Sequence, residues 1–373
     1  MEWKEDVLGN VLEVKYGKDH KKLADGQYPV YGSGGLMRYV DSILYDGPSI
    51  LIPRKGTLNN IMFVDSPFWT VDTMFWSIIN TDKVDPKFLF YSICKRDFAS
   101  MNVGSAVPSM TVNILNDIQI SYPKNISDQR RIASILSSLD RKIELNNKIN
   151  ADLEEMAQAI FKNWFVDFEP FKDGKFVDSE LGMIPEGWKV GSPYEYVKVV
   201  YGAPYKSAKF NDNGEGLPLI RIRDLKDCNP QFYTPEILPQ TEYVNMGDIV
   251  AGMDAEFVPH IWKGNTGLLN QRVCKLMPQQ TSISNLFVLY LMKPELEFVQ
   301  SYKTGTTVSH LGKADIDKFV VVLPPLEVVE ECSKILDSIL QRIKNISTES
   351  RILSTLRDTL LPRLMSGEIE VPE

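Results

Sequence analysis

The fold of this chain follows from residues 127–168, which read SDQRRIASILSSLDRKIELNNKINADLEEMAQAIFKNWFVDF. No proline or glycine interrupts the stretch, and Ser127 or Asp128 offers a side-chain oxygen that could cap a helix. Apolar residues recur at spacings of mostly three and four, which is typical of one face of an α-helix. The stretch therefore predicts a helical rod roughly 60 Å long at about 1.5 Å per residue. The apolar positions are Ile132, Ile135, Leu139, Ile143, Ile149, Leu153, Met156, Ile160 and Trp164.

A similar apolar stripe returns near the end of the chain, between Ile335 and Leu360. A stripe of this length needs a partner, and we predict that the two helices pair with each other. Asn146, Asn147 and Asn150 could fix the register of the pair, although we expect at least two of them to be solvated. The residues expected in the helix–helix contact are Ile135, Leu139, Ile143, Leu153, Ile335, Ile339, Ile343 and Leu353.

Both helices belong to a longer internal repeat. Trp3-Lys4 recurs as Trp188-Lys189 at an offset of 185, and Ile135-Leu136 recurs as Ile335-Leu336 at an offset of 200. Collinear matches of this kind predict two copies of one unit, each a globular part followed by a long helix. A pseudo-twofold axis between the copies would make the helices antiparallel and place the globular parts at opposite ends of the rod. That is the geometry of a protein that reads two separated DNA half-sites.

The globular parts contain short apolar runs bounded by glycine, proline, asparagine or aspartate, such as Ser49–Pro53 and Leu217–Ile222. Gly32-Ser33-Gly34-Gly35 predicts a tight turn and not a phosphate loop, because no helical pattern follows it. We therefore predict an α+β fold with two β-rich mixed domains, joined by two long antiparallel coiled-coil helices. The expected boundaries are 1–123 and 188–324 for the domains, 124–168 and 325–366 for the helices, 169–187 for a linker and 367–373 for a tail.

Composition narrows the possible environment of the protein. The chain has 373 residues, 43% hydrophobic and 24% charged, which is typical of a globular protein with more than one domain. No apolar run approaches the roughly 20 residues that a membrane span needs, and the charged beginning does not resemble a signal peptide. We therefore expect a cytoplasmic protein without a membrane partner. The four cysteines are widely spaced and accompanied by only three histidines, so we expect no metal site.

The net charge of −8 argues against a protein that simply coats DNA. The excess of acid is unevenly distributed, because residues 1–122 carry a net charge of −2 and residues 188–324 carry zero. The globular parts are thus close to neutral. We expect DNA binding by this chain alone to be weak, with a partner protein supplying much of the phosphate contact.

The sequence contains no convincing catalytic motif. Asn229-Pro230-Gln231-Phe232 lacks the second proline of an amino-methyltransferase signature, and no glycine-rich cofactor loop precedes it. Asp167 lies too close to Asp173-Gly174-Lys175 for a nuclease carboxylate cluster, so this segment is better interpreted as a surface linker. There is no phosphate-binding Gly-x-x-x-x-Gly-Lys-Ser/Thr motif. We expect no catalytic residue and no cofactor held by this chain.

The globular parts instead offer polar loops suited to DNA. Arginine and lysine match guanine edges and phosphates, asparagine and glutamine match adenine, and hydroxyl groups bind the backbone. Each such residue could also be an ordinary solvated loop residue. The candidate DNA-binding residues are Arg54, Lys55, Asn59, Asn60, Ser105 and Ser109 in the first copy, and Arg221, Arg223, Asn270, Gln271, Arg272 and Thr306 in the second.

Two stretches carry a resemblance to a known family. The first reads FVDFEPFKDGK at residues 165–175 and is followed by ELGMIPEGW at residues 180–188; the second reads TLRDTLLPRLMSGEI at residues 355–369. They resemble the central and C-terminal conserved regions of Type I restriction–modification specificity subunits. Looser similarity extends over the recognition domains, for example YPVYGSGG at residues 28–35, so the resemblance covers essentially the whole chain.

The resemblance implies that each globular part is a target recognition domain for one half of a split DNA sequence. The helices would form the spacer and dock two modification subunits, which bind S-adenosylmethionine and methylate adenine. Restriction subunits would add ATP- and Mg-dependent translocation and cleavage. The second domain lacks a clean Tyr-Gly-x-Gly-Gly turn, and Tyr205–Leu217 takes its place, so we expect an asymmetric target.

Three alternatives remain open from the sequence. A self-contained coiled-coil regulator with two reading heads would bind its site tightly without a partner. An enzyme with unfamiliar motifs would bind S-adenosylmethionine or modify DNA by itself. A purely structural adaptor would leave the two loop-rich domains unexplained.

Overall fold

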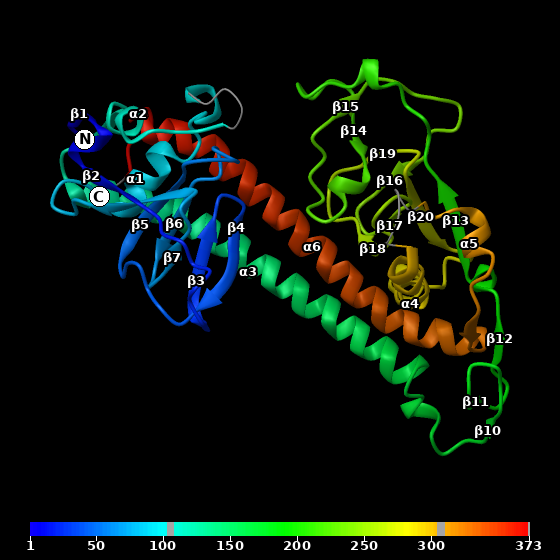
Figure 1. Ribbon diagram of the computed structural model, residues 1–373. Coiled ribbons are helices and arrows are strands. Elements are labelled where there is room, and N and C mark those ends of the chain that lie inside the picture. Colours follow the sequence, from blue (N-terminus) through cyan, green and yellow to red (C-terminus); the bar gives the residue numbers. More distant parts are fainter. Residues whose placement is uncertain (103–107, 304–309, 372–373) are drawn as a thin grey trace. The chain divides into compact units, whose positions relative to one another are not determined.

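The computed structural model describes residues 1–102, 108–303 and 310–371, which form two compact units. Unit 1 comprises Met1–Ile143 together with Ile352–Glu373, and unit 2 comprises Glu144–Arg351. The two long helices, α3 (Ile126–Phe165) and α6 (Leu326–Met365), have 40 residues each, and each contributes a segment to both units (Figure 1). The residue boundaries predicted for the domains stay a prediction.

Unit 1 is built on a four-stranded antiparallel sheet of order β2-β8-β5-β6. A three-stranded sheet of order β4-β3-β7 contains a parallel pair, β3 with β7, and β1 pairs with β9. The strands are β1 Trp3–Val7, β2 Leu12–Tyr16, β3 Asp25–Gly32, β4 Gly35–Val40, β5 Pro48–Pro53, β6 Met62–Asp65, β7 Trp69–Thr70, β8 Met74–Ile79 and β9 Gln119–Pro123; the short helices are α1 Pro86–Ile93 and α2 Val112–Asn116.

The glycine-rich segment of unit 1 forms the tight turn predicted from the sequence. Gly32 ends β3, Gly35 begins β4, and the two residues face each other across a two-residue hairpin. Gly35 has a φ of +111°, in a region that side chains disfavour, and this is why the turn favours glycine at this position.

Unit 2 repeats the plan. Its four-stranded antiparallel sheet has the order β13-β20-β17-β18, and a second sheet of order β15-β14-β19-β16 contains the parallel pair β14 with β19. The elements are β10 Phe176–Val177, β11 Ile184–Pro185, β12 Lys189–Gly191, β13 Val197–Tyr201, β14 Leu217–Ile220, β15 Tyr233–Thr234, β16 Tyr243–Val244, β17 Ile249–Gly252, β18 Pro259–Ile261, β19 Gly267–Leu269, β20 Val273–Pro278, α4 Asn285–Lys303, α5 Lys313–Ile316 and β21 Val321–Leu323. α4 packs against β20, β17 and β18 of this sheet (Figure 1).

The sheets confirm the internal repeat. In order along each sheet, β2, β8, β5 and β6 correspond to β13, β20, β17 and β18, and each unit contains one parallel strand pair in its second sheet. The α+β fold class predicted from the sequence is therefore confirmed.

The long helices pack antiparallel inside each unit. In unit 2, Asn146 contacts Glu349 and Asn150 contacts Ser347, so residue numbers rise on α3 as they fall on α6. In unit 1, buried residues of the two helices join one core with α1 and the main sheet. That core includes Ile132, Ala133 and Leu136 from α3, Leu361 and Leu364 from α6, and Phe88 from α1.

The start of α3 differs from the prediction. Asn125, and not Ser127 or Asp128, precedes the first helical residue, and its Oδ1 accepts a hydrogen bond from the Ser127 amide at 2.9 Å. An asparagine side chain satisfies a free first-turn amide as well as a serine does, so the helix begins earlier.

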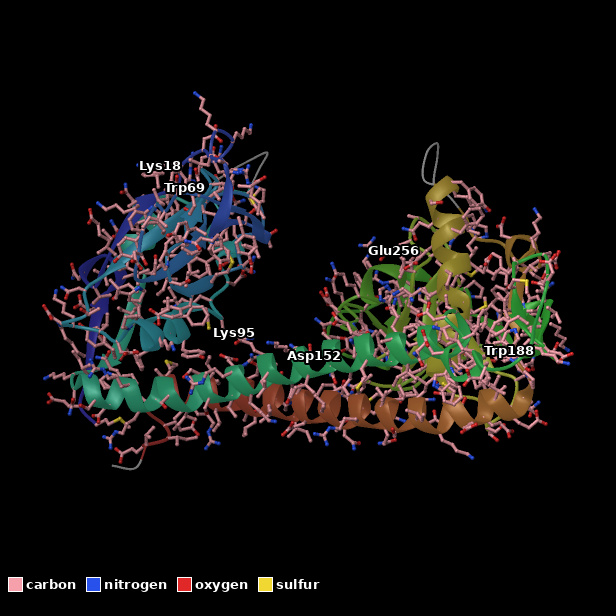
Figure 2. All side chains as sticks on the ribbon, turned by 90° about the horizontal axis from the view of Figure 1, so that it is seen from below. Lys18, Trp69, Lys95, Asp152, Trp188 and Glu256 are labelled. Carbon is pink, nitrogen blue, oxygen red and sulfur yellow. The ribbon has the colours of Figure 1, made fainter. Side chains whose placement is uncertain are left out.

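An aromatic cluster fixes the end of α3 in unit 2. Trp188 lies 6.0 Å from Phe165, 5.3 Å from Phe168 and 5.1 Å from Phe171, measured between ring centroids. The two ends of the stretch of residues 165–188 that carried the family resemblance are thus held together by aromatic contacts to Trp188, which is labelled in Figure 2.

Candidate nucleic-acid interface

In unit 1, three segments meet at the end of β5. The Arg54 amide donates to the Thr73 carbonyl at 2.8 Å, and the Arg54 carbonyl accepts from the Met110 amide at 2.9 Å. Lys55 and Ser109 form an antiparallel bridge beside them. These bonds hold the loop between β5 and β6, residues 54–61, in a defined conformation, with Gly56 at a φ of +89°. We call it the β5–β6 loop.

The two cationic side chains of the β5–β6 loop, Arg54 and Lys55, differ in how far they are engaged within the unit. The Arg54 guanidinium lies 5.5 Å from the centroid of the exposed Tyr16 ring and donates to the Asp72 carbonyl at 3.0 Å. The Lys55 side chain is exposed. Lys55 is therefore the residue of this loop that is available to a phosphate or a guanine edge.

The two asparagines of the loop are engaged within unit 1. Asn59 accepts from the Ala99 amide at 2.9 Å and donates to Asp97 at 3.3 Å. Asn60 donates to the Ser33 carbonyl at 2.9 Å and ties the β5–β6 loop to the glycine turn. Their amides support loop geometry, a role that residue type alone did not indicate.

A second exposed surface of unit 1 is the β3–β4 hairpin. β4 is the outer strand of its sheet, and Leu36, Met37 and Tyr39 on it are 51%, 55% and 50% exposed. On the same unit, the Trp69 indole donates to the Lys18 carbonyl at 2.9 Å, and both residues are labelled in Figure 2. Exposed apolar and aromatic groups suit the grooves of DNA, where methyl groups and sugars are also contacted.

In unit 2, the Arg221 side chain is engaged in contacts that stabilise the fold. Its Nε lies 3.2 Å from Asp224 Oδ2, and its guanidinium lies 4.4 Å from the centroid of Phe232. Phe232 closes the Asn-Pro-Gln-Phe stretch, so that stretch has a packing role here. Arg223, two residues beyond Arg221, is exposed.

The segment before β20 contains three further candidates. Asn270 is only 9% exposed, and its Oδ1 accepts from the Arg272 amide at 3.2 Å, so it shapes the backbone. Gln271 is exposed. Arg272 is exposed and pairs with Asp254, with Nη1 and Oδ2 3.1 Å apart.

Hydroxyl candidates are only partly described. Ser109 is half-buried, and its amide donates to Asn102 Oδ1 at 2.7 Å. Ser105 and Thr306 lie outside the described residues.

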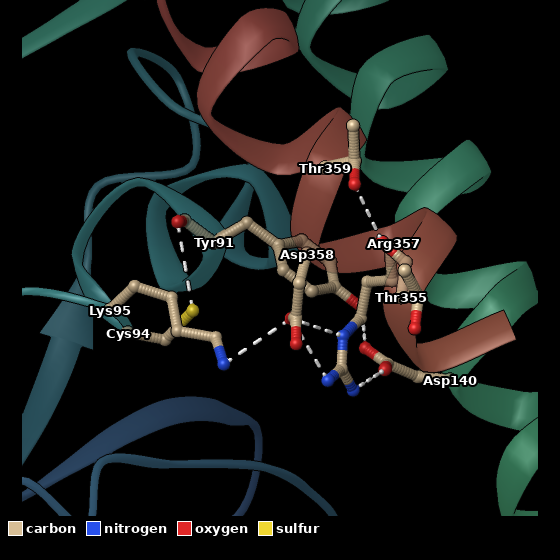
Figure 3. Close-up of polar contacts among 8 residues, drawn as sticks. All are labelled: Tyr91, Cys94, Lys95, Asp140, Thr355, Arg357, Asp358 and Thr359. Carbon is tan, nitrogen blue, oxygen red and sulfur yellow. Dashed lines mark hydrogen bonds and ion pairs between the residues drawn. The ribbon is translucent and has the colours of Figure 1, made fainter. Parts of the chain in front are cut away.

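The domain of unit 1 is joined to both long helices by a polar network (Figure 3). The Tyr91 hydroxyl of α1 donates to Asp140 Oδ2 of α3 at 2.5 Å, and Arg357 Nη1 of α6 donates to Asp140 Oδ1 at 2.8 Å. Arg357 also donates to Asp358 at 3.0 Å, and Lys95 reaches Asp358 at 3.3 Å. The network lines a pocket of about 410 Å³.

Electrostatics in this pocket follow from burial. Burial and the hydrogen bond to Asp140 raise the pKa of Tyr91 well above its usual range. Burial also raises the pKa of the neighbouring Cys94 thiol to about 11, although Lys95 and Arg357 oppose the shift. Both groups are therefore neutral at physiological pH, and Tyr91 acts as a hydrogen-bond donor to the carboxylate.

The helix pair in unit 2 contains a buried polar layer. Asn146 Nδ2 donates to Glu349 Oε2 at 2.8 Å, and Asn150 Nδ2 donates to Ser347 Oγ at 3.0 Å. Asn146 and Asn150 are 1% and 5% exposed, whereas Asn147 is exposed. The expectation that at least two of the three asparagines are solvated was wrong.

Seven of the eight predicted helix–helix residues are buried or half-buried. Ile339 and Ile343 are buried in the unit 2 core, Leu153 packs against it, and Ile135 packs against the unit 1 core. Leu139, Ile143 and Leu353 are half-buried. The structure differs at Ile335, which is 41% exposed, because the buried face of α6 passes through Cys332, Leu336 and Ile339 instead.

No described group of three or more histidine, cysteine, aspartate or glutamate side chains is arranged to hold a metal ion. Among the described helices, none combines the length and apolarity needed to span a membrane. The exposed loop side chains Lys55, Arg223, Gln271 and Arg272 offer hydrogen-bond donors to a ligand. Such a set can bind DNA through phosphates and base edges.

Comparison with known proteins agrees with this chemistry. The family model for the Type I restriction modification DNA specificity domain matches residues 1–155 and 185–354. The MjaIX specificity subunit of Methanocaldococcus jannaschii is 26% identical over 391 aligned positions, covering 95% of this chain and 86% of that protein. The HindI specificity subunit of Haemophilus influenzae is 24% identical and covers 83% of each chain.

One solved structure shares the fold. It is the S subunit of a Type I restriction–modification system from M. genitalium, with a TM-score of 0.57 at 15% identity, covering 97% of this chain and 96% of that chain.

Proposed function

The chain belongs to the family of Type I restriction–modification specificity subunits, and on this premise we propose that it reads the two halves of a split, asymmetric double-stranded DNA target. Members of this family are non-catalytic. The observation that carries the proposal is the repeat of one sheet plan in two units whose loops bear different side chains. Two equivalent scaffolds with different reading groups would recognise two different half-sites.

The charge distribution supports a division of the DNA contacts between this chain and its partner subunits. With net charges of −2 and zero in the two recognition regions, the exposed cations of this chain are balanced by its own acids. Two modification subunits would therefore contribute much of the phosphate contact and would carry S-adenosylmethionine. Restriction subunits would carry ATP and Mg. We assign none of these groups to the present chain.

Exposed apolar residues on the long helices support docking of these partners. In unit 2, Leu145 and Met156 of α3 are 51% and 46% exposed, and in unit 1, Ile352 and Leu356 of α6 are 63% and 44% exposed. Large apolar side chains on exposed helix faces favour association with another protein.

The proposal is tested by expressing this chain with its neighbouring methyltransferase gene and mapping methylated adenines by long-read sequencing. We expect a two-part motif with a fixed unspecified gap that is absent when this chain is omitted. Methylation that does not depend on the chain would contradict the proposal. Tight site-specific binding by the isolated chain, without any effect on methylation, would instead favour a self-contained regulator.

A further inference from the structure

The loop between β17 and β18 in unit 2, residues 253–258, repeats the backbone bonding of the β5–β6 loop. The Met253 amide donates to the Arg272 carbonyl at 2.9 Å, as Arg54 does to Thr73. The Met253 carbonyl accepts from the Leu311 amide at 2.7 Å, as Arg54 does from Met110. We call it the β17–β18 loop.

The match extends to the bridge and to the backbone conformation. Asp254 and His310 form an antiparallel bridge, as Lys55 and Ser109 do. Ala255 follows with a φ of +60°, where unit 1 has Gly56 in the same left-handed region. An alanine in this conformation is disfavoured by roughly 1–2 kcal/mol, so the surrounding bonds impose the loop shape.

The side chains on this common scaffold are different in chemistry. Where unit 1 presents Lys55 and Ser109, unit 2 presents Asp254 and His310, and Arg272 stands where unit 1 has Thr73. Asp254 Oδ2 lies 3.1 Å from Arg272 Nη1, and Asp254 Oδ1 lies 2.7 Å from His310 Nδ1.

Exposure separates the roles of the three groups. The Asp254 side chain is 17% exposed, whereas the side chains of Arg272 and His310 are 54% and 53% exposed. The carboxylate thus holds one edge of the guanidinium and one edge of the imidazole. The remaining edges face solvent, with the His310 Nε2 side and the rest of the arginine fork available to a ligand.

We propose that Arg272 and His310, oriented by Asp254, read base edges of the DNA half-site bound by unit 2, with Arg272 on a guanine. This inference rests on the proposed function. A carboxylate 3.1 Å from Arg272 neutralises its charge and would repel a phosphate, which disfavours a backbone contact. A guanidinium held on one side retains the paired donors that match guanine O6 and N7.

The test compares methylation motifs of Arg272→Lys, His310→Ala and Asp254→Asn in the full complex. Arg272→Lys keeps the charge but removes the planar fork. We expect about tenfold or greater loss of preference for one guanine in one half of the motif, with the other half unchanged. His310→Ala should relax a neighbouring position, and Asp254→Asn should weaken preference at both.

Two control variants make the result specific. Lys189→Ala removes another exposed cation of unit 2 that is paired with an acid, Glu195, at 2.8 Å. Ala255→Gly relieves the disfavoured backbone without touching the reading groups. Both should preserve the wild-type motif, and thermal unfolding of every variant should show a folded chain.

The outcomes are distinguishable. A wild-type motif that persists in Arg272→Lys and His310→Ala would overturn the inference while leaving the proposed function intact. A uniform loss of methylation at all sites, with the motif unchanged, would assign these groups to the DNA backbone and would also overturn it. Absence of any motif with the wild-type chain would refute the proposed function itself.

Discussion

Substituting Arg357 by alanine tests how the recognition domain of unit 1 is fixed to the long helices. Arg357 donates to Asp140 at 2.8 Å, and Asp140 in turn accepts from Tyr91 on α1 at 2.5 Å. Loss of the guanidinium leaves a half-buried carboxylate with one donor fewer. We therefore expect α1 to open more readily from the helix pair.

The magnitude follows from the exposure of the pair. The side chains of Arg357 and Asp140 are 23% and 27% exposed, which places the pair between a surface and a buried ion pair. Breaking a fully buried pair costs about 3–5 kcal/mol, and an exposed pair contributes about 0–1 kcal/mol. After the discount for solvent, we expect Arg357→Ala to destabilise this contact by roughly 1–3 kcal/mol.

Amide hydrogen exchange in α1, residues 86–93, measures the effect locally. The expected loss corresponds to exchange that is roughly 5- to 150-fold faster, at about 1.4 kcal/mol per tenfold. Arg363→Ala is the matched control, because Arg363 lies on the same helix in a more exposed pair with Glu368. Exchange in α1 that changes less than about twofold, or equally in both variants, would refute the reasoning.

Three further predictions concern other parts of the chain. Asn150 Oδ1 is buried without a hydrogen-bond partner among the described residues, so Asn150→Leu combined with Ser347→Ala should raise the free energy of unfolding of unit 2 by about 1–2 kcal/mol; a loss of stability in urea titration would contradict this. Lys55→Ala should lower the slope of log affinity against log salt by about 1 if Lys55 binds a phosphate, measured on the full complex, whereas an unchanged slope would exclude that contact. The pKa of Cys94 is raised to about 11, so the rate of Cys94 alkylation should rise about tenfold per pH unit between roughly pH 8 and 10. The free energy of unfolding that comes from burying the neutral thiol should be fully present below about pH 9 and lost as the pH rises toward 11. An alkylation rate that does not change above pH 9 would show an ordinary thiol.

The sequence predicted the long helices well because their signal is local. Apolar spacing and the lack of proline or glycine identified α3 to within a few residues of Ile126–Phe165. The choice of capping residue and the burial of Asn146 could not be predicted, because they depend on which face of α3 meets α6. Ile335 matched Ile135 in the repeat, yet its exposure depends on the rotation of α6.

The candidate site was less predictable because its contacts are long-range. Arg221 has the right residue type for DNA, but Asp224 and Phe232 engage it in the folded chain. Asp254 and His310 are brought together by strand pairing over 56 residues, which no short motif reveals. The repeat offset near 200 contained the missing signal, since Asp254 lies 199 residues after Lys55.

The discontinuity of unit 1 affects how the chain can fold during synthesis. Leu136 and Leu361 share one core although they are 225 residues apart in the chain. At a translation rate of about 5–20 residues per second, the first leucine leaves the ribosome roughly 10–45 s before the second. Unit 2 is continuous in sequence and can fold first. Until the last part of α6 has been synthesised, the apolar face of unit 1 stays exposed and can bind chaperones.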